Sequence, residues 1–555
     1  MKVKYACACI AIALFIVTAS VPGSRASADI LVKTSTHYIQ VPASADTQSP
    51  TISLAATLYQ PRLFPSAPAV IYIHGWGGHR LTGTDNLAYY IAASGYTVLS
   101  YSARGFGNGE SGGRVTLAGP NEINDLKNVI DWLLNDTDGV IDARVTKIGV
   151  IGGSYGGGHS FQIASDPRVS AVVPIIGWTD LEQALFPNGA VNYRLGIGEF
   201  YGGINQGVGT PPFYNYDRIE FEMFDAAAEG RSPDSSIKQD LRARSIAEQD
   251  GNGREVLKPS RQPRVPTFII QSWDDYLFPS TQVLDIFSQI DAPKQIYMGR
   301  QGHPPGGQEY DGEELYIGTA VLRWFDHYLR GIGGTDSRNI SSATAPFNLG
   351  PTTYSEFPSA DAQPVALYFK EGGTLARKRK GKNRQETAGA IFHPQRIRSS
   401  QSGAEIPPKS DMFSATTERV GSLPTSLTYT YPAWESDTEL MGPSEFNMYV
   451  SSSTSDTLDL IVRMFDVGPA GDETEVTVGV IRVTGLMPGN LKRVTFRDFG
   501  DHWIFRKGHS LRVKVTNIDF PDFRPPGAND NLVSDFTLHS GKASPSSLRV
   551  AIRSR

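Results

Sequence analysis

A serine enclosed by glycines gives the clearest indication of chemistry in this sequence. Segment 152–156 reads Gly-Gly-Ser-Tyr-Gly; it follows the apolar run 147–151 and precedes a stretch, 159–164, expected to be helical. A sharp turn from a strand into a helix lifts a serine hydroxyl off the edge of a sheet, and glycines fit the crowded backbone around it. The pattern predicts that Ser154 is a nucleophile. A plain glycine-rich turn is the alternative.

A serine hydroxyl needs a base to accept its proton and a carboxylate to orient that base. In α/β-hydrolases these two residues come after the serine, the acid first and the histidine second, each after a late strand. Asp275 follows the apolar run 265–270, and His303 follows the next run, 294–298. We therefore predict a triad of Ser154, Asp275 and His303. Asp274 is the alternative acid.

Two backbone N–H groups are candidates for holding the oxyanion that forms during acyl transfer. Tyr155 directly follows the proposed nucleophile and begins the expected helix, so its N–H can point at the developing charge. The second donor is expected in the loop after the apolar run 69–73, which reads His-Gly-Trp-Gly-Gly. We predict that the N–H of Trp76 supplies it.

The elements that must position these residues indicate a parallel sheet. Continuous apolar runs at 69–73, 96–101, 147–151, 169–174, 265–270 and 294–298 are separated by helical stretches such as 122–134. Runs of this kind are typical of parallel strands that are covered by helices on both faces. We assign 29–334 to an α/β-hydrolase fold. Within it, 181–262 breaks the pattern and is expected to be an inserted cap.

The character of the chain changes after the proposed catalytic domain. Segment 335–354 is rich in Gly, Ser, Thr and Pro, and we expect a linker there. Segments 456–465, 475–483 and 511–516 partly alternate apolar and polar residues, as half-buried antiparallel strands do. A β-sandwich over 355–555 is therefore expected.

The N-terminus has the features of a signal peptide. Lys2 and Lys4 precede an apolar run at 6–19, and Ala26-Ser-Ala28 provides small residues before a cut. We expect cleavage near Ala28 and a secreted or periplasmic protein. A membrane anchor is the alternative, although the run is shorter than the roughly 20 residues that a span needs. No membrane span is expected elsewhere.

Charge and composition argue against several classes of partner. The formal net charge is −5, which gives no field to attract nucleic acid. Both cysteines, Cys7 and Cys9, lie in the proposed leader, so no disulfide or thiol chemistry is expected after cleavage. No metal site or cofactor is expected. The basic run 376–384 is interpreted as a solvated loop, with contact to a polyanion as the alternative. The sequence leaves the oligomeric state open.

Several motifs together resemble one family of hydrolases. They are the elbow at 152–157, the loop Arg-Gly-Phe-Gly-Asn-Gly-Glu-Ser-Gly-Gly at 104–113, and Ser-Trp-Asp-Asp at 272–275. The tail at 505–515, followed by Asp-Phe-Pro at 519–521, is similar to a C-terminal jelly-roll domain. The chain thus resembles the X-Pro dipeptidyl-peptidase (S15) and cocaine-esterase-like (CocE/NonD) hydrolases over nearly its whole proposed mature length.

The resemblance implies acyl-enzyme chemistry on a small-molecule ester or amide or on a peptide. It also implies catalytic roles for the three triad residues. Esterases of this group often take an oxyanion donor from a tyrosine side chain, but the corresponding loop here has none. A dipeptidyl peptidase also needs an acid for the substrate amine, and Glu182, Glu199 and Glu220 are the candidates. The alternatives are therefore a serine esterase or amidase, an Xaa-Pro dipeptidyl peptidase, and a catalytically inert binding protein.

Overall fold

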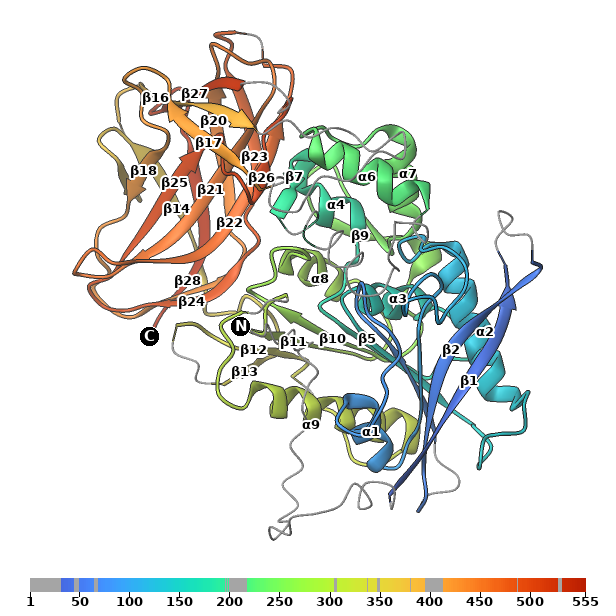
Figure 1. Ribbon diagram of the computed structural model, residues 1–555. Coiled ribbons are helices and arrows are strands. Elements are labelled where there is room, and N and C mark those ends of the chain that lie inside the picture. The colour runs from blue at the N-terminus through green and yellow to red at the C-terminus, as the bar shows by residue number, and fades with distance from the viewer. Residues whose placement is uncertain are drawn as a thin grey trace, which may run out of the picture.

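The computed structural model describes residues 31–43, 49–63, 68–194, 196, 198, 217–303, 307–336, 338–346, 350–379, 381–394, 413–486, 488–527 and 532–555. An α/β region, a cap above it and a C-terminal β-rich region make up the molecule (Figure 1). The proposed signal peptide, 1–28, lies outside the described residues.

One mixed sheet forms the centre of the α/β region. Its ten described strands have the order β1-β2-β4-β3-β5-β6-β10-β11-β12-β13. Their bounds are β1 Val32–Pro42, β2 Thr51–Pro61, β3 Ala69–Ile73, β4 Thr97–Tyr101, β5 Ile148–Gly153, β6 Ala171–Ile175, β10 Thr267–Ser272, β11 Lys294–Gly299, β12 Ile340–Ser342 and β13 Thr352–Tyr354. Neighbours from β4 to β12 are parallel, and the pairs β1–β2, β2–β4 and β12–β13 are antiparallel. The predicted parallel sheet is thus confirmed.

Helices cover both faces of this sheet, which explains why its central strands are continuously apolar. The helices are α1 Leu87–Ala93, α2 Pro120–Asn135, α3 Tyr155–Ile163, α8 Ser280–Phe287 and α9 Glu313–Phe325, with a π-helical turn at Asp326–Arg330. Residues of α1 and α9 share one buried core with the sheet, and residues of α2 share another. Among the described helices, none combines the length and hydropathy that crossing a bilayer requires.

The cap lies between β6 and β10 in the sequence. Its described elements are α4 Leu181–Leu185, a 3-10 turn at Pro187–Gly189, β7 Val191–Asn192, α6 Arg218–Ala228, α7 Ser235–Ala243, β8 Ala247–Gln249, β9 Glu255–Leu257 and a 3-10 turn at Pro259–Arg261. Asp217 and Glu220 form a capping box that begins α6. β7 pairs with β26 of the C-terminal region, so the cap is joined to both of the other parts.

The C-terminal region is almost entirely β-structure, as expected. Its strands are β14 Gln363–Lys370, β15 Thr374–Ala376, β16 Arg384–Pro394, β17 Ala415–Arg419, β18 Leu427–Thr430, β19 Thr438–Gly442, β20 Glu445–Ser451, β21 Leu458–Val467, β22 Glu473–Val483, β23 Lys492–Arg497, β24 Asp501–Phe505, β25 Ser510–Thr516, β26 Phe523–Arg524, β27 Leu532–Ser540 and β28 Ser547–Ser554. In β25 buried and half-buried residues alternate strictly, which is the pattern that predicted it.

The segment expected to be a linker, 335–354, contributes to the fold. Its strands β12 and β13 extend the catalytic sheet by two strands beyond β11. Beyond β12, Ala345 exchanges backbone hydrogen bonds with β24 of the C-terminal region. The segment therefore connects the edge of the catalytic sheet to the C-terminal region.

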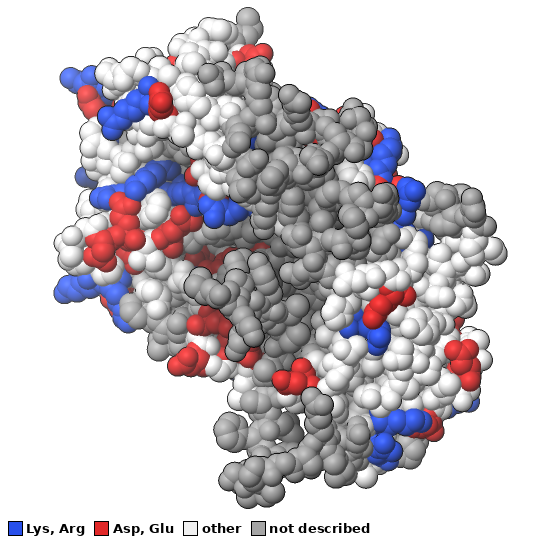
Figure 2. Space-filling view, viewed as in Figure 1, with Lys and Arg blue, Asp and Glu red and all other residues white. Residues whose placement is uncertain are grey.

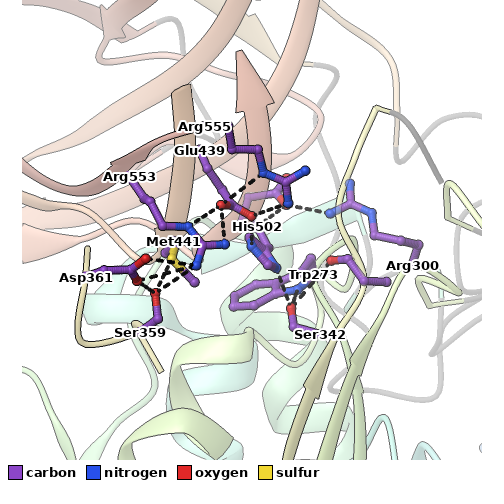
Figure 3. A network of polar contacts seen from close by, with 12 residues as sticks. Trp273, Arg300, Ser342, Ser359, Asp361, Glu439, Met441, His502, Arg553 and Arg555 are labelled. Carbon is purple, nitrogen blue, oxygen red and sulfur yellow. Dashed lines mark hydrogen bonds and ion pairs between the residues drawn. The ribbon is translucent and has the colours of Figure 1, made fainter. Parts of the chain in front are cut away.

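A buried hydrogen-bonded chain crosses this domain boundary (Figure 3). Ser342 Oγ lies 2.8 Å from His502 Nδ1, and His502 Nε2 lies 2.8 Å from Glu439 Oε1. Glu439 also accepts hydrogen bonds from Arg553 and Arg555. We call Ser342, His502 and Glu439 the interdomain chain.

Charged residues of both signs are mixed on the C-terminal region. On the face shown in Figure 2, Lys and Arg lie among Asp and Glu at the upper left. Within the predicted basic loop, Arg377 Nε donates to Tyr431 Oη, and Arg384 pairs with Glu371. The solvated loop and the polyanion contact both remain predictions for this segment.

Candidate active site

Ser154 lies at the turn between β5 and α3, at the carboxyl edge of the sheet. Its φ of 55° and ψ of −113° fall in a region that residues other than glycine rarely adopt, and such strain is typical of a nucleophile elbow. A Cβ on Gly156 would lie 2.3 Å from the carbonyl oxygen of Ile73, and one on Gly157 would lie 2.6 Å from that of Ile175. These glycines are required because α3 packs directly on the strand ends.

The structure brings the three predicted triad residues together. Ser154 Oγ lies 2.9 Å from His303 Nε2, and His303 Nδ1 lies 3.0 Å from Asp275 Oδ2. We call these residues the active-site chain. Asp275 follows β10 and His303 follows β11, and both strands end at the same sheet edge as β5.

Asp275, and not its neighbour Asp274, contacts the histidine. Asp275 is fully buried, and its Oδ1 accepts the backbone N–H groups of Leu277 and Phe278 at 3.0 and 2.9 Å. Asp274 instead lies 2.7 Å from a guanidinium nitrogen of Arg300. Two backbone donors leave Oδ2 of Asp275 directed at the imidazole, so the carboxylate can fix the orientation of the ring.

The loop after β3 lies close to Ser154, as an oxyanion donor requires. A Cβ on Gly75 would lie 3.8 Å from Cβ of Ser154, so this loop and the elbow are in near contact. His74 holds the loop: its Nε2 accepts the N–H of Ala103 at 3.0 Å, and its Nδ1 donates to the carbonyl of Gly75 at 2.7 Å. Burial lowers the pKa of His74 to about 4, so the ring is neutral near pH 7.

A buried glutamate behind the elbow escaped the sequence analysis. Glu122, in α2, accepts hydrogen bonds from the hydroxyl of Tyr155 at 2.7 Å, the N–H of Thr116 at 2.9 Å and the N–H of Gly119 at 2.5 Å. It therefore fixes the side chain that follows the nucleophile. The periodicity of α2 identified position 122 as helical, but gave no signal for this contact.

An apolar pocket opens beside Ser154. Loop, elbow and cap all contribute to its wall, which includes Trp76, Leu117, Trp178, Leu181, Phe224 and Phe278. The aromatic and aliphatic side chains suit an apolar group bound next to the nucleophile. Within the described residues, no group of three or more His, Cys, Asp or Glu side chains fits a metal ion.

The three acids considered for an amine lie in different surroundings. Glu182 pairs with Arg242 at 2.7 Å and with Lys238 at 3.8 Å, away from the pocket wall. Glu199 lies outside the described residues. Glu220 is buried and lines the pocket that Ser154 also lines.

Two family models match successive parts of the chain. Residues 50–305 match the X-Pro dipeptidyl-peptidase (S15 family), and residues 333–549 match the X-Pro dipeptidyl-peptidase C-terminal non-catalytic domain. Among curated proteins, the quorum-quenching protein AidA of Acinetobacter baumannii (strain MDR-ZJ06) is 30% identical over 142 residues. That match covers 25% of this chain and 45% of AidA, so the chain spans less than half the length of this relative.

Solved structures share the fold over almost the whole chain. A CocE/NonD family hydrolase from Staphylococcus aureus has a TM-score of 0.68 at 17% identity, with 93% of this chain and 94% of that chain covered. An α-amino acid ester hydrolase has a TM-score of 0.70 at 17% identity, with 98% and 100% covered. At such identities the likeness establishes the fold alone. The two family models, which together take in most of the sequence, establish that the catalytic and C-terminal regions of this chain belong to the X-Pro dipeptidyl-peptidase (S15) family of hydrolases.

Proposed function

We propose that this hydrolase cleaves carboxylic esters or amides through an acyl-enzyme on Ser154, with His303 as base and Asp275 as its orienting carboxylate. The observation that carries the proposal is the unbroken active-site chain, with 2.9 Å from Ser154 Oγ to His303 Nε2 and 3.0 Å from His303 Nδ1 to Asp275 Oδ2. Both distances are within the reach that proton transfer requires.

In the acylation step, Ser154 Oγ attacks the carbonyl carbon of the substrate while its proton moves to Nε2 of His303. The bond to the leaving alcohol or amine then breaks, and the imidazolium returns that proton to the leaving group. Asp275 stabilises the imidazolium through Nδ1 and remains ionised. Water repeats the sequence on the acyl-enzyme, with His303 again as base, and releases the carboxylic acid.

The oxyanion is assigned to the backbone N–H groups of Tyr155 and Trp76. Tyr155 is the first residue of α3, so its N–H belongs to the unsatisfied donors of a helix N-terminus. The near contact between Gly75 and Ser154 supports the assignment of Trp76, the residue that follows Gly75.

The acyl part of the substrate is assigned to the apolar pocket, because that pocket begins at Ser154 and has aromatic and aliphatic walls. Uncharged esters with an apolar acyl group suit its lining. The second candidate is an Xaa-Pro dipeptidyl peptidase. It is favoured by one observation, the carboxyl group of Glu220 in the same pocket.

Activity profiling of the purified protein tests the proposal. A fluorophosphonate probe should label the wild type and should not label Ser154→Ala. p-Nitrophenyl esters should be hydrolysed with higher kcat/KM than Ala-Pro-p-nitroanilide. The opposite order would favour the peptidase, and a wild type that is neither labelled nor active would favour an inert binding protein.

Export is proposed from the leader sequence alone. Lys2, Lys4 and the apolar run 6–19 support it, and the leader should be removed after Ala28. N-terminal sequencing of the protein from a secreting host should begin at Asp29. An intact N-terminus on membrane-associated protein would support the anchor instead.

A further inference from the structure

Glu220 has an unusual position for a carboxyl group. It is 1% exposed and lies in the wall of the apolar pocket beside Ser154. Its Oε2 accepts the backbone N–H of Asp217 at 3.1 Å, which closes the capping box of α6. Its Oε1 has no hydrogen-bond partner among the described residues. One oxygen of this carboxyl group thus serves the helix, and the other has no partner in the described part of the protein.

The surroundings of Glu220 favour its neutral form. Burial raises the pKa of Glu220 well above its usual range, and the negative charge of Glu122 raises it further. Asp217 acts in the same direction, whereas the Arg244 guanidinium opposes it. Arg244 is itself directed elsewhere, since it donates to the carbonyls of Thr116 and Asp240. Burial without a cationic partner thus favours the carboxylic acid, whose O–H is a donor.

A donor without an acceptor in an apolar wall is unfavourable, because polar groups buried without partners lose their hydration. Most of the pocket wall is apolar, with Leu181, Leu185, Met223 and Phe224 among its side chains, and the polar side chains that share it are those of Ser154, Tyr155 and Asn192. An acceptor oxygen on a bound acyl group would satisfy the O–H. It would do so without bringing a charge into the pocket.

We propose that Glu220 determines acyl specificity by donating a hydrogen bond to an uncharged oxygen, such as a ketone, ether or amide oxygen, within the acyl chain of the substrate. The preferred substrates are then esters or amides of mostly apolar acids that carry such an oxygen beyond the scissile carbonyl. This inference rests on the proposed acylation of Ser154. It assigns Glu220 a role different from that of an anionic anchor for a substrate amine.

Matched substrates isolate the contribution of one oxygen. The panel contains p-nitrophenyl octanoate and three ether analogues of it. In each analogue, the methylene at carbon 3, 5 or 7 is replaced by an oxygen. The measured quantity is kcat/KM of each ether ester divided by that of octanoate, which removes effects common to the series. For the best analogue, this ratio should fall about tenfold from wild type to Glu220→Leu, the size expected when one partner of a buried hydrogen bond is removed.

Two control variants separate recognition from helix capping. Glu220→Gln keeps the shape, the acceptor for the Asp217 N–H and a donor, so its ratio should stay within about threefold of the wild type. Asp217→Ala loosens the start of α6 but retains the acid, and its ratio should be unchanged. If the ether-to-octanoate ratio of kcat/KM fell equally in Asp217→Ala and Glu220→Leu, Glu220 would have only a structural role and the inference would be overturned.

The pH dependence gives an independent readout. The donor exists only while Glu220 is protonated, so the wild-type ratio should fall as pH rises toward the raised pKa of this group. In Glu220→Gln the ratio should be independent of pH. A wild-type ratio that stays constant over the stable pH range of the enzyme, or that persists in Glu220→Leu, would contradict the proposal.

Failure of the inference and failure of the proposed function give different results. An enzyme that hydrolyses the panel with the same ratio in all variants retains its function but lacks this recognition. A wild type that hydrolyses nothing and is not labelled by a fluorophosphonate loses both. Preferential cleavage of Ala-Pro-p-nitroanilide, abolished by Glu220→Gln, would show an anionic amine anchor and overturn the neutral-donor role.

Discussion

The active-site chain and the interdomain chain contain the same three functional groups at similar distances. Each links a serine hydroxyl to a histidine and the histidine to a carboxylate, with separations of 2.8–3.0 Å. The ring is used in opposite directions: Nε2 faces the serine in the active-site chain, and Nδ1 faces it in the interdomain chain. The distances alone therefore do not distinguish a reactive serine from a structural one.

The surroundings of the two serines make the difference. Ser342 is fully buried, and its hydroxyl oxygen also accepts the indole N–H of Trp273 at 3.0 Å. Ser154 is half-buried, lies at a strained φ of 55° and lines the apolar pocket. A substrate carbonyl can therefore reach the hydroxyl of Ser154 and not that of Ser342. We infer that the interdomain chain stabilises the domain boundary and that the active-site chain performs chemistry.

The largest contrast is expected from removing each hydroxyl and measuring catalysis. Ser154→Ala should lower kcat/KM by about 10⁴- to 10⁶-fold, because the nucleophile is lost. Its melting temperature should remain close to that of the wild type, since the side chain is only half-buried. Ser342→Ala is the matched control and should keep its turnover. Comparable turnover in the two variants would refute the distinction.

The next effect concerns the carboxylate of the interdomain chain. Glu439→Ala should lower the free energy of unfolding by about 3 kcal/mol, because it leaves the buried ring of His502 without its acceptor and the partly exposed Arg553 and Arg555 without their ion-pair partner. The groups affected are His502, Arg553 and Arg555. Urea denaturation followed by tryptophan fluorescence measures the loss. A change below about 1 kcal/mol would mean that the chain does not hold the domain boundary together.

The same carboxylate should make stability depend on acid pH. Burial opposes ionisation of Glu439, but hydrogen bonds from His502, Arg555 and Arg553 outweigh it and lower the pKa of Glu439 below its usual range. The unfolded chain then takes up this proton at a higher pH than the folded protein does, so the contribution is present near pH 7 and is lost as pH falls below about 5. Denaturation at several pH values should show a steeper acid decline for the wild type than for Glu439→Gln. Equal slopes would assign the acid sensitivity to other groups.

The smallest effect is expected from Ser342→Ala on stability. The substitution leaves the indole N–H of Trp273 and one ring nitrogen of His502 without their shared partner. Unsatisfied buried groups of this kind lower the free energy of unfolding by about 1–3 kcal/mol. Thermal or urea denaturation beside Ser342→Thr, which retains a hydroxyl, provides the measurement. No difference between the two variants would mean that another group replaces the hydroxyl.

The sequence predicted much of the active-site chain because the chemistry leaves local signals. Glycines around Ser154 indicate a turn that only small residues permit, and the apolar runs before Asp275 and His303 indicate strands. Parallel strands then place these residues at one edge. The sequence left Asp274 as the alternative acid, and in the structure Asp275 contacts His303 whereas Asp274 pairs with Arg300.

The interdomain chain and the pocket wall left no such signals. Ser342 lay in a segment that composition presented as a linker, and nothing near His502 or Glu439 distinguishes them from surface residues of a β-sandwich. The sequence did not distinguish Glu220 from Glu182 and Glu199, and only burial in the pocket wall marks Glu220. Each of these features depends on contacts between segments far apart in the chain, which local periodicity does not encode.

By itself, the sequence determined the types of the elements, the order of the domains and the turn that exposes Ser154, because backbone sterics and hydrophobic periodicity act over a few residues. The tertiary structure alone decided which serine faces a pocket, which carboxyl group is buried in the wall of that pocket and which histidine is enclosed between domains. Burial and desolvation arise only when distant segments pack, and they set whether the same groups react or merely hold the fold together.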